Sequence, residues 1–103
     1  MIDLTRPVPC KKFLEQPFSD QLAHIGSEVE EASIAYGDYV AAPYIGDAAG
    51  QALAKERLAE ELTDVITAAT TALEMLGYDE EARIEMQRRV NEKNRVRGYW
   101  EAD

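Results

Sequence analysis

Two pairs of acidic side chains have the spacing that chemistry at a metal ion requires. Glu28 and Glu31 lie three residues apart in SEVEEA. Glu61 and Asp64 have the same spacing in AEELTDVI. Side chains three residues apart are neighbours on an α-helix, and four carboxylates in one small volume repel one another unless a cation neutralises them. Clusters made only of oxygen ligands suit hard cations, and Mg²⁺ is the first candidate. Acidic pairs with this spacing also occur on solvated helix faces.

The first pair falls within a predicted amphipathic helix. From Ser19, a plausible N-cap, apolar residues recur at spacings of three and four and form an arc centred near Val29 and Tyr36. This pattern predicts a helix that ends at residues 39–42. Residues 41–50 contain proline, two glycines and an aspartate, and therefore predict a loop.

Two further helices are predicted from the rest of the chain. One starts between residues 47 and 53, with Leu62 and Leu76 on its core side. Another starts after Asp79, a good N-cap, and runs to about Arg97. The chain has almost no β-type alternation. We therefore expect an all-α fold, a helical bundle with antiparallel core helices that dimerisation completes.

The acidic pairs are expected at the edges of the two core helices. At about 100° per residue, Glu28 and Glu31 lie on one edge of the apolar arc, and His24 lies one turn earlier on that edge. His24 could contact a substrate, although a lone helical histidine is more often a structural hydrogen-bonding group. Antiparallel packing could bring all four carboxylates together.

The third predicted helix is basic towards its end. Six of the 11 basic residues lie within residues 83–97, and Lys93 and Arg97 share a stripe with Val90 that would face the bundle. Asn94 flanks this stripe. Cations on a bundle-facing stripe need anions nearby. Those anions are either the acids of the first two helices or the phosphates of a nucleotide.

Taken together, these motifs resemble the MazG-like, all-α nucleotide pyrophosphohydrolases. The resemblance rests on the ordered ExxE and ExxD pairs and on the later stretch NEKNRVRGYW, and it covers about residues 19–100. It implies a helical core that assembles as a homodimer or homotetramer. It also implies Mg²⁺-dependent hydrolysis of a nucleoside triphosphate to a monophosphate and pyrophosphate, with Mn²⁺ as a possible substitute.

The resemblance also assigns roles to particular residues. It makes four acids the metal ligands and catalytic residues, namely Glu28, Glu31, Glu61 and Asp64. It gives phosphate or sugar contacts to Lys93, Asn94 and Arg97. The sequence departs from the family pattern at Glu30, where glycine is common, and in the length of the loop between the acidic helices.

Composition limits the other classes of function. With 20 acidic and 11 basic residues among 103, the formal net charge is -9, which argues against a nucleic-acid binder. The lone Cys10 excludes a disulfide framework and a cysteine zinc site. No apolar run of about 18 residues predicts a membrane span, and no signal peptide is apparent, so we expect a cytoplasmic protein. Residues 1–18 should be an extended segment before a helical domain at residues 19–100.

Two alternatives remain open at this point. Phosphoribosyl-ATP pyrophosphohydrolases perform the same chemistry on another substrate, and the residues named here do not separate the two activities. The chain could instead be a non-catalytic helical interaction module whose acids are solvated surface. In either enzyme we expect a homodimer at least, with the acidic edges near its interface.

Overall fold

Helices make up most of the fold. The computed structural model describes residues 2–45 and 48–100. Its elements are a short 3₁₀ helix η1 (Lys11–Phe13) and three α-helices, α1 (Phe18–Ile45), α2 (Ala48–Met75) and α3 (Glu80–Val96). No strand occurs among the described residues, which confirms the all-α prediction. Within that same part of the chain, no helix has the length and apolarity needed to cross a membrane.

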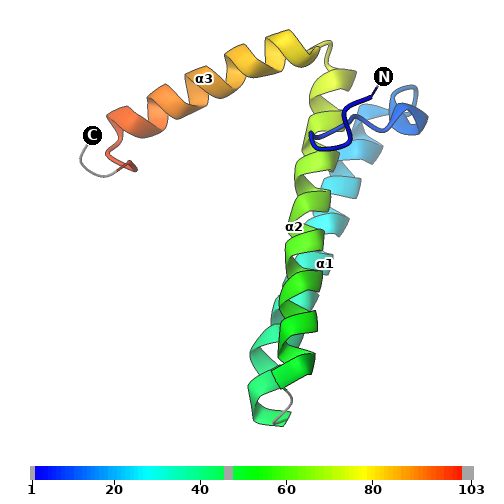
Figure 1. The fold of residues 1–103 in the computed structure, drawn as a ribbon. Helices are drawn as coiled ribbons and strands as arrows, with labels where there is room; N and C mark the ends of the chain where they lie inside the picture. Colours follow the sequence, from blue (N-terminus) through cyan, green and yellow to red (C-terminus); the bar gives the residue numbers. More distant parts are fainter. Residues whose placement is uncertain (1, 46–47, 101–103) are drawn as a thin grey trace.

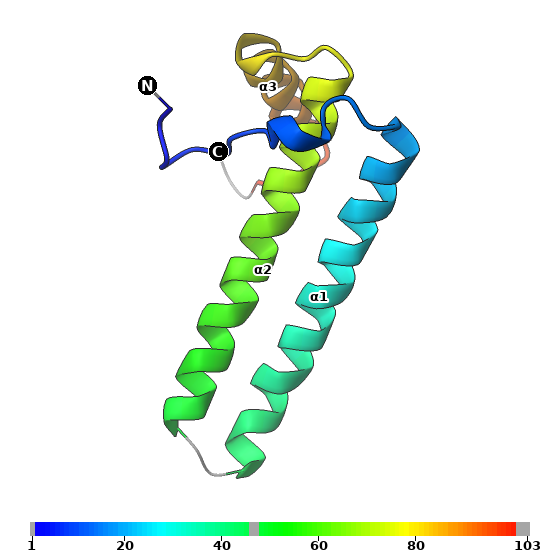
Figure 2. The same ribbon diagram turned by 90° about the vertical axis from the view of Figure 1, so that its right-hand side faces the viewer.

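The antiparallel pair of α1 and α2 contains nearly all of the packing between helices (Figures 1 and 2). Among the residues whose burial the structure describes, the fully buried apolar ones are alanines, namely Ala32, Ala35, Ala42, Ala68 and Ala72. The buried Gln21 side chain crosses the pair, its Nε2 donating to the Ala68 carbonyl at 3.0 Å. Small side chains allow the two helix backbones to approach closely. We call this contact the alanine seam.

The large apolar residues are not in that core. Val29 and Tyr36, which mark the centre of the predicted apolar arc, are exposed, as are Leu62 and Leu76 of α2. The prediction that they form the core side is therefore wrong for the single chain. Because alanines occupy the seam, the larger side chains of the same arc lie to one side of it.

Both α1 and α2 extend further into residues 41–50 than the sequence predicts. α1 continues through Pro43 to Ile45, and α2 begins at Ala48. Most of the loop expected at residues 41–50 is therefore helical, and only residues 46–47 of it lie outside the described residues. Pro43 lies in the last turn of α1, where it has no N–H to donate to the Tyr39 carbonyl, and the helix continues for only two more residues. The neighbouring alanines favour helix. α1 also starts at Phe18, so that Ser19 lies in its first turn and does not cap it.

The N-terminal segment crosses the open end of the helix pair (Figure 2). The backbone N–H of Cys10 donates to Thr71 Oγ1 of α2 at 3.0 Å, and Thr71 is fully buried. The ring of Phe13, in η1, lies 5.4 Å from the His24 ring of α1. The N-terminal segment, which the sequence predicts as extended, therefore docks on both core helices.

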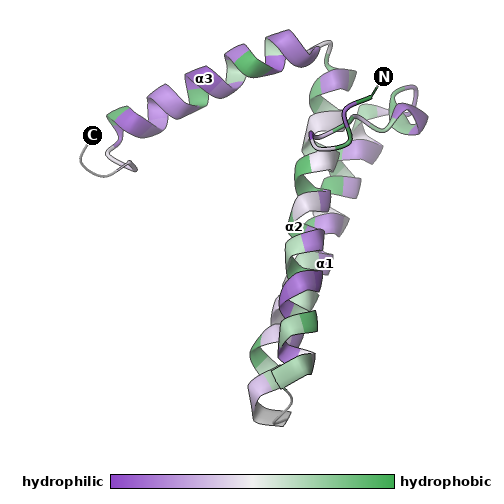
Figure 3. Ribbon diagram, viewed as in Figure 1, coloured by the Kyte–Doolittle hydropathy of each residue, from purple (hydrophilic) through white to green (hydrophobic). Residues whose placement is uncertain are grey.

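α3 leaves the pair after a tight turn (Figure 1). Gly77 has a positive φ of 90°, and the Tyr78 N–H donates to the Leu73 carbonyl at 3.0 Å, which closes α2 as a Schellman motif. Asp79 caps α3 as predicted, its Oδ1 accepting from the Ala82 N–H at 2.9 Å. Arg83 fastens the start of α3 to α2 through an ion pair with Glu74. Beyond that point α3 is mostly hydrophilic (Figure 3).

Removal of the Thr71 hydroxyl tests how the N-terminal segment docks. Thr71→Val leaves the Cys10 N–H without its acceptor, and we expect the free energy of unfolding to fall by about 1–3 kcal/mol. Urea titration followed by circular dichroism measures the change. Thr70→Val is the matched control, because the Thr70 hydroxyl only donates to the Ile66 carbonyl of its own helix, at 2.8 Å. Equal losses in both variants would contradict the docking.

Candidate metal centre

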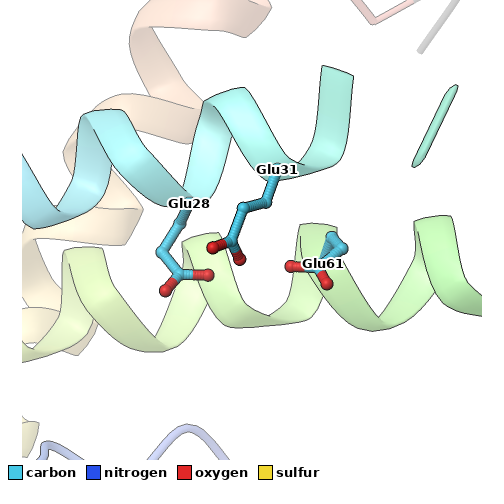
Figure 4. Close-up of side chains that lie close together, drawn as sticks. All are labelled: Glu28, Glu31 and Glu61. Atoms are coloured by element: carbon cyan, nitrogen blue, oxygen red, sulfur yellow. The ribbon is translucent and has the colours of Figure 1, made fainter. Parts of the chain in front are cut away.

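Three of the four predicted acids meet between α1 and α2. Carboxylate oxygens of Glu28, Glu31 and Glu61 all lie within 4.8 Å of one another. Figure 4 shows the first two side chains reaching from adjacent turns of α1 towards Glu61 on α2. The alanine seam sets this separation, because it holds the two backbones close beside the acids. We call this cluster the acidic triad.

The acidic triad contains carboxylate oxygens that lack a partner. Glu28 Oε2 and Glu61 Oε2 are both buried and accept no hydrogen bond. A buried, unpaired carboxylate oxygen costs free energy that a bound cation would recover. With three carboxylates and no nitrogen or sulfur donor among the three, the donor set fits a hard divalent cation such as Mg²⁺.

The electrostatics of Glu61 reflect the same crowding. Burial raises the pKa of the Glu61 carboxyl above its ordinary value of 4.5, and the negative charge of Glu31 raises it further. Asp64 and Glu28 act on this pKa in the same direction. Desolvation and repulsion together therefore disfavour the charged form of Glu61 in the folded chain.

His24 lies beside the acidic triad, as its place in the sequence predicts. Its Nε2 is 3.5 Å from Glu28 Oε1, one turn along α1. The Phe13 ring packs on its other side. His24 thus connects the docked N-terminal segment to the triad.

Asp64 stands outside the triad. It is exposed on α2 and lines a shallow hollow with Glu60 and Thr63. Its charge still affects the Glu61 pKa, so it lies near the edge of the cluster. In this conformation the structure therefore brings together three of the four acids that the sequence singles out.

A groove runs from the acidic triad along the helix pair. It has a volume of about 340 Å³, and its lining includes Glu31, Glu61, Asp38 and Arg57. Arg57 forms no ion pair with the described residues. Sequence reasoning missed this arginine, although its position four residues before Glu61 places both on one face of α2.

The predicted phosphate-binding residues of α3 lie elsewhere in the chain. Lys93 is exposed and Asn94 is half-buried near the end of α3, and the exposed Arg97 directly follows that helix. The end of α3 projects away from the helix pair (Figure 1). The expectation that Lys93 and Arg97 point into a bundle is therefore not met within one chain. A role for them at the acidic triad stays a prediction.

Comparisons with known proteins identify no family for this chain. No family model matches the chain, and no curated protein and no solved structure shows significant similarity to it. The resemblance to MazG-like proteins therefore stays a prediction that rests on the motifs.

Substitution of Glu61 tests the repulsion within the acidic triad. Because its pKa is raised in the folded protein, Glu61 favours folding most below pH 4.5, and this contribution is lost as the pH rises through the raised pKa. In the presence of a chelator, Glu61→Gln should therefore unfold at a higher urea concentration than the wild type at pH 7. The difference should shrink towards pH 4.

Glu60→Gln is the control, since Glu60 is exposed at the neighbouring position. It should leave the midpoint nearly unchanged. If Glu61→Gln unfolded at a lower urea concentration than the wild type at pH 7, the triad would not destabilise the folded state.

Proposed function

We propose that this protein is a Mg²⁺-dependent nucleoside triphosphate pyrophosphohydrolase, which releases a monophosphate and pyrophosphate. The observation that carries the proposal is the acidic triad, with its two buried and unpaired carboxylate oxygens. The adjoining groove supports it, because its lining combines carboxylates with Arg57, which forms no ion pair with the described residues. The ordered motifs of the sequence point to the same chemistry.

Each residue of the site has a task in this reaction. Glu28, Glu31 and Glu61 would hold Mg²⁺, and Asp64 would join them after a change of side-chain rotamer. The bound ion would neutralise the triphosphate and polarise the phosphorus under attack. His24 would position the Glu28 carboxylate, which it approaches to 3.5 Å.

Hydrolysis of the α–β anhydride also needs a proton acceptor. The oxygen of water bonds to one phosphorus, while the bridging oxygen leaves with the other. A carboxylate of the cluster that is not engaged with the cation takes the proton from the attacking water. The Arg57 guanidinium, in the same groove, would bind the phosphates and stabilise the charge that develops on them.

The cationic end of α3 enters this proposal in a different way. Lys93 and Asn94 lie near the end of α3 and Arg97 directly follows it. Because that end projects away from the helix pair (Figure 1), a contact with the phosphates requires a second chain or a different placement of the helix. Arg95 is less available, because it is already paired with Glu92 on the same helix.

A pyrophosphate-release screen tests the proposal. The purified protein is assayed with standard and damaged nucleoside triphosphates and with phosphoribosyl-ATP, with Mg²⁺, with Mn²⁺ and with a chelator. Release that needs the divalent cation supports the proposal, and the preferred substrate separates it from the phosphoribosyl-ATP activity. No release from any substrate would favour the non-catalytic interaction module.

Neutral substitutions of the acids should abolish that activity. Glu28→Gln, Glu61→Gln and Asp64→Asn each remove a charge that the bound cation needs, so we expect pyrophosphate release to fall at least a hundredfold, roughly 3 kcal/mol or more. Circular dichroism should show unchanged helix content. Glu30→Gln and Glu60→Gln, which alter exposed acids outside the acidic triad, should be nearly neutral. Near-normal turnover in the first set would exclude these ligands.

The role of Arg57 is tested by its removal. Loss of a charge-assisted phosphate contact costs roughly 1.5–3 kcal/mol, so Arg57→Ala should lower kcat/KM about ten- to a hundredfold. Lys55→Ala is the matched control, because Lys55 lies two residues away on another face of α2. An equal loss in both variants would show that only diffuse positive charge matters.

A further inference from the structure

The N-terminal segment, residues 2–17, docks on the helix pair at two points (Figure 2). The Cys10 N–H donates to the hydroxyl of Thr71, a fully buried residue of α2, at 3.0 Å. The Phe13 ring packs against the His24 ring of α1, with 5.4 Å between the ring centroids and 46° between the ring planes. Because the Phe13 N–H also donates to the Cys10 carbonyl at 3.0 Å, the first contact fixes where the Phe13 ring lies.

The Phe13 ring limits the positions that the His24 side chain can take. His24 is half-buried on α1, and its Nε2 lies 3.5 Å from Glu28 Oε1, one turn further along the helix. A histidine side chain samples several rotamers when nothing packs against it, and each restriction of that freedom costs entropy. A docked aromatic ring imposes the restriction in advance, so the imidazole stays near the carboxylate at little further cost.

The contact with His24 makes the two oxygens of Glu28 unequal. Oε1 faces His24 Nε2, whereas Oε2 is buried and accepts no hydrogen bond. The Glu28 side chain is only 15% exposed. Oε2 is therefore the oxygen that remains for a cation. In metal centres, a group that contacts the far side of a ligand orients it, and removal of that group typically weakens metal binding about ten- to a hundredfold.

We propose that the N-terminal segment is part of the cation site. Phe13 is a positioning residue that fixes the His24 ring, and His24 in turn orients the Glu28 carboxylate within the acidic triad. The proposal rests on the cation site of the proposed function. Coupling between two binding events is reciprocal. The docked segment therefore strengthens cation binding, and a cation on the acidic triad stabilises the docked segment.

Titration with Mn²⁺ measures the cation affinity without any turnover, since electron paramagnetic resonance counts the free ion. Phe13→Ala and His24→Ala should each weaken binding about tenfold or more. Because Phe13 acts through His24, the double variant should bind no more weakly than His24→Ala alone. Phe13→Tyr keeps the ring and should bind as tightly as the wild type. Leu14→Ala is the matched control, because it removes a half-buried apolar side chain from the same segment and keeps the ring, and its affinity should be unchanged.

The reverse effect is measured at Cys10, whose half-buried thiol lies where the segment docks. Saturating Mg²⁺ should slow the reaction of this thiol with an aromatic disulfide reagent in the wild type. In His24→Ala, which lacks the connection between the acidic triad and the segment, saturating Mg²⁺ should leave the rate unchanged.

Three results of the titration would overturn the proposal and leave the cation site in place. The first is equal Mn²⁺ affinity in the wild type, Phe13→Ala and His24→Ala. The second is a double variant that shows the sum of the two single losses, because Phe13 would then act independently of His24. The third is a loss in Leu14→Ala as large as that in Phe13→Ala. A wild type that binds no Mn²⁺ would overturn the cation site and this proposal together.

Discussion

Close packing along the alanine seam is the constraint on which the other features depend. With Ala32, Ala35 and Ala68 between them, α1 and α2 approach closely enough for carboxylates of the two helices to meet. Larger seam residues would separate the backbones and disperse the acidic triad. The same packing moves the bulky side chains of each apolar arc to one side of the pair. The small residues of the seam thus account both for the acidic cluster and for the exposure of large apolar side chains such as Val29 and Leu62.

Much of the helical framework could be predicted from local signals. Asp79 and Gly77 have strong positional preferences, and the structure uses both as predicted, at the start of α3 and the end of α2. Pro43 gave a wrong boundary, because α1 continues for two residues beyond it. The assignment of Val29 and Tyr36 to the core failed for another reason. Periodicity identifies an apolar arc, but it does not say which part of the arc the neighbouring helix covers.

The sequence likewise predicted only some of the residues of the candidate site. The spacing of Glu28, Glu31 and Glu61 predicted the edge of the helix on which each one lies, and antiparallel packing of the two helices then brings the three carboxylates together. Asp64 could not be placed, because its position at the edge depends on the rotation of α2 about its axis. Arg57 could not be chosen from 11 basic residues until the groove that it lines was visible. Long-range placement, rather than helix formation, is what the sequence alone leaves undetermined.

The acidic triad also affects the stability of the single chain. Burial and repulsion at Glu61 raise its pKa, so the metal-free chain at neutral pH holds this site against its own electrostatics. Among the described residues, the fully buried apolar side chains are alanines, each of which buries little area, while larger ones such as Ile25, Leu58 and Val65 are half-buried. A single chain therefore has little stability to spare for a strained site. Neutralisation of the triad by a cation would relieve this deficit, so cation binding should stabilise the folded state.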